Sequence, residues 1–166
     1  MIEIVRADIT TLRVDAIVNA ANEALAPGGG VCGAIYRAAG SKLVDATSRI
    51  GGCATGDAVL TPGFSLPARF VIHAVGPIWH GGNAREAELL RQTYDSAFRV
   101  ARGEPTIRSI AFPAISTGIY GFPKHLAADI AVRAMRDHDR AFDRIVACLF
   151  DPESEEYYAE AERALR

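Results

Sequence analysis

The sequence predicts an α/β sandwich with a largely parallel or mixed central sheet. Short apolar runs rich in Val and Ile alternate along the chain with segments of helical periodicity, an order typical of this fold class. Several runs are apolar on both faces, which predicts buried strands with helices packed on either side. The chain has 166 residues, with neither an internal repeat nor a long linker, so we expect one domain over residues 1–166.

Six apolar runs are predicted as strands. In chain order they are Ile2 to Val5, Ala16 to Ala20, Ala58 to Thr61, Phe70 to Val75, Ser109 to Ile115 and Ile145 to Phe150. In sheets of this class, ligands bind outside the carboxyl ends of the strands. The loops that follow these strands are therefore the segments in which to look for a site.

The helices are predicted from apolar residues that recur every three or four positions. Such patterns run from Cys32 to Leu43 and from Leu90 to Ala101. A third helix is predicted after Pro123, and its inward residues are Leu126, Ile130 and Ala134. A fourth is predicted from Glu153, and its inward residues are Tyr158, Ala161 and Leu165.

Composition and charge exclude several functional classes. Hydrophobic residues make up 49% and charged residues 23%, a globular balance. The formal net charge of −2 gives no basic field for nucleic acid or an anionic membrane. No apolar run is long enough to span a membrane, and the first residues lack the features of a signal peptide. Three widely spaced cysteines without a C-x-x-C pair argue against a zinc ribbon or a disulfide framework, so we expect a cytoplasmic protein.

The loop after the second predicted strand is rich in glycine and asparagine. Asn19 and Asn22 flank the strand end, and Gly28-Gly29-Gly30 precede a helix start near Val31. Glycines let main-chain N–H groups approach a phosphate or ribose closely, and the positive end of the helix points to the same place. Side-chain amides suit sugar hydroxyls, although a turn or cap role stays open for each Asn. We favour an anion or sugar site over a loop that only caps the helix.

The same glycines keep a second class of function open. Gly28, Gly30 and Gly33 match G-x-G-x-x-G, the dinucleotide-binding pattern, so a nicotinamide-dependent oxidoreductase is a remote alternative. That pattern needs its first glycine directly at the strand end, whereas residues 21–27 intervene here. No strand ending in an acidic residue follows about 20 positions later. The context therefore argues against this alternative.

A second loop of similar chemistry follows the fifth predicted strand. Residues 116–123 read Ser-Thr-Gly-Ile-Tyr-Gly-Phe-Pro, with hydroxyls and glycines ahead of a helix start. No G-K-[ST] is present, so this is not a Walker A loop. Two such loops after two strands of one sheet would bracket a diphosphate. The sequence shows no His, Asp and Glu cluster with metal-ligand spacing, so neither a metal nor a cofactor is expected.

Taken in order, these segments resemble the macrodomain family of ADP-ribose-binding modules. The resemblance covers essentially the whole chain, and the segments that support it are Asp8 to Thr10, Asp15 to Asn22, Gly28 to Ala39, Thr61 to Pro67, Val71 to Pro77 and Pro113 to Gly121. The most similar branch contains bacterial and mitochondrial O-acetyl-ADP-ribose deacetylases and mono-ADP-ribosyl hydrolases. The resemblance implies a three-layer α/β/α sandwich around a mixed sheet.

The resemblance also implies roles for individual residues. The residues implied to contact the ligand are Asp8, Ile9, Gly29, Gly30, Val31, Ser116, Thr117, Gly118, Ile119, Tyr120 and Phe150. Among them, Asp8 and Ile9 would bind the adenine, Phe150 would flank its face, and the loop residues would line the diphosphate and inner ribose. For Asp8 a turn or helix cap is the alternative, and for Phe150 a core position. We expect His73, inside an apolar strand, to be a hydrogen-bonded core histidine.

The implied catalytic group is Asn19, Asn22, Cys32 and Tyr36. The two Asn residues would face the distal ribose, where hydrolytic members break an ester bond. Many hydrolytic relatives have Asp in place of Cys32 and His in place of Tyr36, whereas certain viral macrodomains resemble this chain at both positions. Cys32 near a helix N-terminus is also a candidate nucleophile, but no paired His is apparent in the sequence. A pocket-wall role is the favoured interpretation of Cys32.

Three functions follow from these observations. The leading hypothesis is a metal-independent hydrolase that removes mono-ADP-ribose from acidic side chains, deacetylates O-acetyl-ADP-ribose, or does both. The second is a non-catalytic ADP-ribose reader, and the third is the oxidoreductase. The partners implied by the resemblance are ADP-ribose or O-acetyl-ADP-ribose and mono-ADP-ribosylated proteins. No membrane partner is expected, and no nucleic acid unless it is itself ADP-ribosylated.

Overall fold

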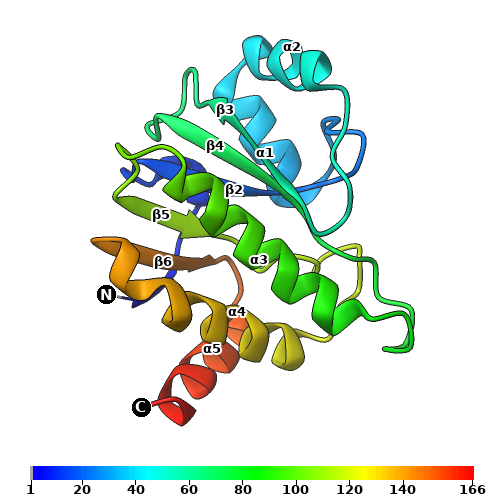
Figure 1. The fold of residues 1–166 in the computed structure, drawn as a ribbon, viewed down its shortest axis with the longest axis vertical. Coiled ribbons are helices and arrows are strands. Elements are labelled where there is room, and N and C mark those ends of the chain that lie inside the picture. Colours follow the sequence, from blue (N-terminus) through cyan, green and yellow to red (C-terminus); the bar gives the residue numbers. More distant parts are fainter. Residues whose placement is uncertain (1) are drawn as a thin grey trace.

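The computed structural model describes residues 2–166, which form a mixed six-stranded sheet in the order β1-β6-β5-β2-β4-β3 (Figure 1). The strands are β1 (Ile2–Arg6), β2 (Ala16–Ala21), β3 (Ala58–Pro62), β4 (Phe70–Val75), β5 (Ser109–Phe112) and β6 (Arg144–Leu149). All neighbouring strands are parallel except β3, which runs antiparallel to β4. The predicted α/β class with a mixed, largely parallel sheet is confirmed.

Helices cover both faces of this sheet. They are α1 (Gly30–Ala39), α2 (Ser41–Ile50), α3 (Glu86–Arg102), α4 (Lys124–His138) and α5 (Pro152–Ala164), with the short 3-10 helices η1 (Ile9–Thr11) and η2 (Asp139–Ala141). Val18 and Ile72 face the cluster that α3, α4 and α5 complete, whereas Ile17 and Val71 face α1 and α2. Because adjacent strand residues point to opposite faces, one sheet supplies both cores. The three-layer α/β/α sandwich is confirmed.

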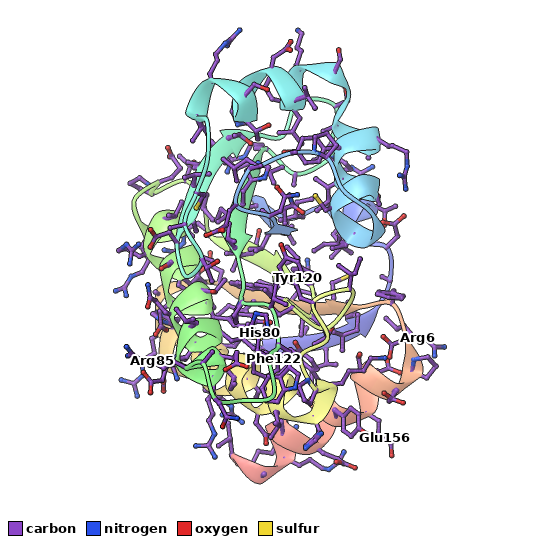
Figure 2. The ribbon with its side chains drawn as sticks, turned by 90° about the vertical axis from the view of Figure 1, so that its right-hand side faces the viewer. Arg6, His80, Arg85, Tyr120, Phe122 and Glu156 are labelled. Atoms are coloured by element: carbon purple, nitrogen blue, oxygen red, sulfur yellow. The ribbon has the colours of Figure 1, made fainter. Side chains whose placement is uncertain are left out.

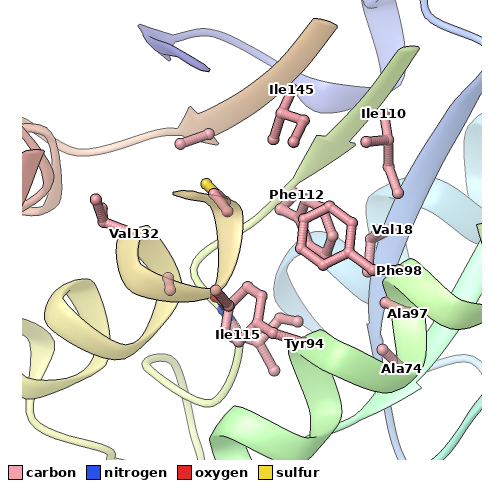
Figure 3. Close-up of a cluster of buried hydrophobic side chains, with 14 of the residues drawn as sticks. Val18, Ala74, Tyr94, Ala97, Phe98, Ile110, Phe112, Ile115, Val132 and Ile145 are labelled. Atoms are coloured by element: carbon pink, nitrogen blue, oxygen red, sulfur yellow. Dashed lines mark hydrogen bonds between the residues drawn. The ribbon is translucent and has the colours of Figure 1, made fainter. Parts of the chain in front are cut away.

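The larger core lies between the sheet and α3 and α4 (Figure 3). Phe98 of α3 packs on Phe112 of β5 with ring centroids 4.8 Å apart, and both side chains are fully buried. Burial of one such side chain contributes about 1.5–3 kcal/mol. This packing fixes the end of β5 and therefore the start of the loop that follows it.

Three predicted boundaries or faces are wrong. The pattern from Cys32 to Leu43 is two helices, because Gly40, with φ of +89°, ends α1 before α2 begins. β5 stops at Phe112 rather than Ile115, because Pro113 has no N–H to continue the ladder. Leu126 is 40% exposed, since the buried face of α4 consists mostly of Ala residues and of Val132 and Met135.

The parallel strands place five connecting segments at one edge of the sheet. The residues after β1, β6, β5, β2 and β4 all leave from the carboxyl ends of their strands. A depression lined by Arg13, Asp15 and Arg69 lies at the opposite edge, before β2 and β4, and contains no predicted site residue. Within residues 2–166, no helix combines the length and apolar character that crossing a membrane requires.

Candidate functional site

Two loops from neighbouring strands form the centre of the candidate site. β2 and β5 pair with each other, so the loop of residues 22–29 after β2 lies beside the loop of residues 113–123 after β5. The first loop leads directly into α1 at Gly30. In α1 the first main-chain N–H that bonds a carbonyl is that of Gly33, which donates to Gly29. The N–H groups of Gly30 and Val31 therefore have no acceptor within the helix. These groups and the helix dipole favour an anion at this point.

Side chains brace the first loop from within the protein. The Asn22 side chain donates through Nδ2 to the Ala26 carbonyl at 2.9 Å and accepts through Oδ1 from the Ala26 N–H at 3.0 Å. The Tyr36 hydroxyl donates to the Leu25 carbonyl at 2.5 Å. Burial raises the pKa of Tyr36, so its hydroxyl stays protonated as this donor. The loop is therefore held in one conformation before any ligand arrives.

A buried polar chain lies behind this loop. Asn19 Nδ2 lies 3.1 Å from His73 Nδ1 and 3.7 Å from Cys32 Sγ, and His73 Nε2 lies 3.0 Å from Thr61 Oγ1. The Cys32 thiol in turn lies 3.7 Å from the Ala26 carbonyl. Burial lowers the pKa of His73 to about 4, so the imidazole is neutral and can accept from Asn19. His73 is thus the hydrogen-bonded core histidine that the sequence predicts.

These contacts correct part of the predicted catalytic group. The Asn19 side chain is fully buried, with Nδ2 directed to His73, whereas its Oδ1 has no hydrogen-bond partner among the described residues. Tyr36 and Cys32 are 7% and 6% exposed, and their polar atoms point to Leu25 and Ala26 of the loop. Within residues 2–166 no imidazole or amine hydrogen-bonds the Cys32 thiol, so no base is placed to activate it. Asn22 is half-buried and is the member of the group most open to a ligand.

The second loop presents its main chain in an unusual conformation. Ser116 has φ of +70°, and the Phe122 N–H donates back to its carbonyl at 2.9 Å, which closes the loop. The Gly121 N–H donates to the Gly118 carbonyl at 3.0 Å inside this turn. Among the described residues, no carbonyl accepts from the N–H groups of Gly118, Ile119 or Tyr120. Successive free N–H groups of this kind form an anion-binding concavity.

Two further features of this loop are relevant to ligand binding. The Ser116 hydroxyl is buried and has no hydrogen-bond partner in the described chain, a costly arrangement unless a ligand or water satisfies it. A Cβ on Gly76, after β4, would collide with that hydroxyl, so only glycine fits there. Ser116 and Gly121 have a positive φ but Gly118 does not, and a Cβ on Gly118 would meet no protein atom.

The electrostatics of Tyr120 indicate that the two loops lie close together. Burial raises the pKa of Tyr120, and the proximity of Glu23 in the first loop and of Cys32 in α1 raises it further. Tyr120 is half-buried, whereas Ile119 beside it is fully exposed. Thr117 directs its hydroxyl to the Ala114 carbonyl at 2.9 Å and so supports the loop from inside.

The segments after β1 and β6 supply the predicted adenine end. Asp8 is exposed, and its Oδ1 accepts from the Thr10 N–H at 2.9 Å and from the Thr10 hydroxyl at 2.7 Å, which caps η1. Oδ2 of Asp8 has no protein partner in the described chain and can accept from a ligand. Ile9 is buried, and Phe150 is 83% exposed rather than a core residue. β1 and β6 are adjacent, which places Asp8 and Phe150 at the same part of the edge.

The segment that supports the second loop from outside was not identified from the sequence. Trp79 lies in the segment between β4 and α3, and its main-chain N–H donates to the Tyr120 carbonyl at 2.8 Å. Its indole ring packs on Phe122 with centroids 4.8 Å apart. Glu86, at the start of α3, accepts hydrogen bonds from main-chain N–H groups of the same segment. Glu86 is buried, which is unusual for a charged residue and indicates a structural role. This burial cannot be seen in the sequence.

Curated relatives are similar over nearly the full chain. A macro domain-containing protein of Ralstonia nicotianae is 59% identical over 87% of this chain and 84% of its own length. A protein named O-acetyl-ADP-ribose deacetylase from Salmonella gallinarum is 48% identical over 95% of this chain and 92% of its own. The family model described as Macro domain matches residues 18–131.

Solved structures agree with these sequence relatives. A mutant of the Oceanobacillus iheyensis macrodomain solved with ADPR superposes with a TM-score of 0.93 at 39% identity, covering 99% of this chain and 92% of that one. A Trypanosoma brucei macrodomain in complex with ADP-ribose superposes with a TM-score of 0.88 at 37% identity, covering 99% and 69%. The fold, the family model and the full-length relatives agree, and the chain belongs to the macro domain family.

Proposed function

We propose that this protein binds ADP-ribose and hydrolyses esters formed on its distal ribose, in O-acetyl-ADP-ribose or in proteins mono-ADP-ribosylated on Asp or Glu. The observation that carries the proposal is the pair of braced loops on neighbouring strands β2 and β5. Both present unpaired main-chain N–H groups at one edge of the sheet, which suits a diphosphate between them. Relatives named O-acetyl-ADP-ribose deacetylase support the choice of substrate.

In this proposal the two ends of the ligand contact different parts of the site. The adenine lies at the edge formed by Asp8, Ile9 and Phe150, where a carboxylate oxygen and an exposed ring are available. The distal ribose lies near Asn22, whose amide retains a second donor and a second acceptor position beyond its two bonds to Ala26. The ligand thus runs from the β1–β6 side to the β2 loop.

The proposed reaction is attack of a water held between the distal ribose and the diphosphate. The water oxygen bonds to the ester carbonyl carbon, and the bond from that carbon to the ribose oxygen breaks. One water proton passes to the ribose oxygen, and the other is released to solvent from the new carboxyl group. The products are ADP-ribose and acetate, or ADP-ribose and the freed carboxyl of the protein. Asn22 and the loop donors act by positioning, which in enzymes lowers the barrier by several kcal/mol (about 7–11 in the best cases). We propose that no metal takes part.

A thiol nucleophile is the competing mechanism at Cys32. Substitution of Cys32 by Ser preserves a group that can accept from Asn19 and donate to Ala26, but its hydroxyl is far less ionised than a thiol. We expect Cys32→Ser to keep most of the wild-type turnover. A variant that folds and binds ADP-ribose yet has lost all turnover would assign the chemistry to the thiol.

A non-catalytic reader is the second candidate function. It is favoured by the burial of Asn19, Cys32 and Tyr36, because Asn19 Nδ2, the Cys32 thiol and the Tyr36 hydroxyl contact other groups of the protein. The test is to incubate the protein with O-acetyl-ADP-ribose in EDTA, to follow ADP-ribose by chromatography, and to measure ADP-ribose affinity by calorimetry. Binding with turnover supports the hydrolase and binding without turnover the reader, whereas the absence of binding contradicts both.

A further inference from the structure

The carboxylate of Glu86 is enclosed by main-chain N–H groups of the segment that precedes its own helix. Oε2 accepts from the N–H groups of His80 at 2.8 Å and Gly82 at 2.9 Å, and Oε1 accepts from that of Ala84 at 2.6 Å. The residue is 1% exposed. An N-terminal helix cap binds N–H groups of its own first turn, whereas these three donors lie outside α3.

The bonding pattern shows that Glu86 is ionised. Burial alone would raise its pKa, but the main-chain N–H groups of His80, Gly82, Glu86 itself and Ala84 outweigh burial and lower the pKa to about 2. No Lys, Arg or His of residues 2–166 forms an ion pair with it. The negative charge is therefore balanced by main-chain donors and by the N-terminus of α3, and it holds the segment in a tight curve.

That curve positions Trp79. The N–H bound at 2.8 Å belongs to the peptide unit that joins Trp79 to His80, so Glu86 fixes the main chain directly after the indole. On the other side, Gly82 adopts φ of +94°, and a Cβ there would lie 3.1 Å from the Trp79 ring. The ring is thus held between the curved segment and Phe122, at 4.8 Å.

Trp79 in turn contacts the loop of residues 116–122 at two points. Its N–H donates to the Tyr120 carbonyl at 2.8 Å, and its ring packs on Phe122, which closes the loop by bonding the Ser116 carbonyl. Figure 2 shows His80, Tyr120 and Phe122 in the same central part of the molecule. Because the Tyr120 carbonyl is engaged by Trp79, the peptide group that joins Tyr120 to Gly121 is fixed in orientation, and with it the end of the turn that carries the free N–H groups.

We propose that Glu86 is a positioning residue for the ligand-binding loop, acting through Trp79 on residues 116–122. The proposal rests on the proposed function, in which the free N–H groups of Gly118, Ile119 and Tyr120 bind the diphosphate. The ionised carboxylate of Glu86 holds residues 80–84 in place. These residues fix Trp79, and Trp79 sets the orientation of residues 116–122 before the ligand binds. Such preorganisation contributes to affinity because the loop does not have to be ordered on binding.

The test compares Glu86→Gln with Glu88→Gln. Glu86→Gln keeps one acceptor oxygen, but the other is replaced by an NH₂ group, which cannot accept from a main-chain N–H of the segment. The control removes a carboxylate of the same helix that is 68% exposed and pairs only with Arg85. ADP-ribose affinity is measured by calorimetry, and folding by far-UV circular dichroism on heating.

We expect Glu86→Gln to weaken ADP-ribose binding about tenfold or more, on the scale of a lost hydrogen bond to a charged group, while Glu88→Gln binds as wild type does. Trp79 is the single tryptophan of the chain, so its fluorescence reports on this segment alone. Its emission should shift in Glu86→Gln at temperatures where circular dichroism still shows the folded state. A purely structural role would change only the melting temperature.

Each outcome bears on a separate claim. Wild-type protein that does not bind ADP-ribose contradicts the proposed function itself. Wild-type protein that binds, together with folded Glu86→Gln of unchanged affinity and unchanged Trp79 emission, overturns the role of Glu86. Should Glu86→Gln fail to fold, Trp79→Leu removes the ring contact with Phe122 and leaves the carboxylate in place. Wild-type affinity in that variant also overturns the proposal.

Discussion

The side chain of Asn22 forms two hydrogen bonds with the main chain of Ala26, one through each of its polar atoms. The contacts close the first turn of the glycine loop and hold the amide at the entrance to α1. Asn22 therefore holds the loop, and under the proposed function it has a second task, to present its amide to the ribose. Its replacement should show which task dominates.

Asn22→Ala should lower kcat more than it weakens ADP-ribose binding. Positioning of a water acts on the transition state, so its loss affects turnover first. We expect kcat to fall about 100-fold, the scale of a small misplacement of reacting groups, with a smaller change in Kd. Turnover of O-acetyl-ADP-ribose and calorimetric affinity provide the two numbers. Equal losses in both would show that Asn22 acts only by bracing the loop.

Asp8→Ala should weaken ADP-ribose binding by about 1–3 kcal/mol, because the adenine amine would lose its charged acceptor. The variant also removes the cap that Asp8 provides to Thr10. Thr10→Val is the matched control, because it removes the side-chain bond to Asp8 and leaves the carboxylate in place. Calorimetry on both variants separates the roles. Equal affinity of Asp8→Ala and wild type would reduce Asp8 to a cap.

Gly118→Val should abolish ADP-ribose binding and leave the fold intact. A Cβ at Gly118 would meet no protein atom, and the residue has no positive φ, so we expect the variant to fold. A branched side chain at this point would instead occupy the space in which a diphosphate approaches the main chain. Calorimetry and a melting curve measure the two effects. Normal binding would place the ligand away from the second loop.

The buried His73 should make the protein less stable in mild acid. Its pKa is about 4 in the folded state because of burial, against 6.5 when unfolded. A depressed pKa means that the stabilisation is complete above pH 6.5 and is lost as the pH falls towards 4. The difference corresponds to about 3 kcal/mol. Glu86, with a pKa of about 2 against 4.5, acts only at lower pH.

Urea unfolding between pH 7 and pH 4 tests this dependence, with His73→Gln as the control. Gln can bond to both Asn19 and Thr61 but does not titrate in this range. We expect the free energy of unfolding of the wild type to fall over this interval and that of the variant to fall less. Parallel curves for the two proteins would assign the acid sensitivity to other groups.

Much of the fold could be predicted because the strands are marked locally. The runs around Ile17, Val71 and Val146 are apolar on both faces, and this pattern alone indicates a sheet covered on two sides. The errors arose where one residue overrides a periodicity. Gly40 splits a continuous helical pattern, and Pro113 ends a strand whose apolar run continues to Ile115.

The candidate site was predictable in position but less so in the orientation of its side chains. The loops with Asn22 and Gly118 lie at the carboxyl edge because of strand direction, which the βα alternation implies. The burial of Asn19 and Tyr36 depends on partners distant in sequence, such as His73 and Thr47. No local pattern encodes those contacts, and the role of Glu86 was invisible for the same reason.

The most direct test of the hydrolase is release of ADP-ribose from a protein carrying mono-ADP-ribose on glutamate, measured with wild-type enzyme in EDTA. We expect free ADP-ribose to accumulate over many turnovers and the modification to disappear from the protein. Asn22→Ala, which loses positioning, should release it far more slowly under the same conditions. Wild-type protein that binds ADP-ribose tightly but never releases it from the ester would contradict the hydrolase and leave a reader of the modification.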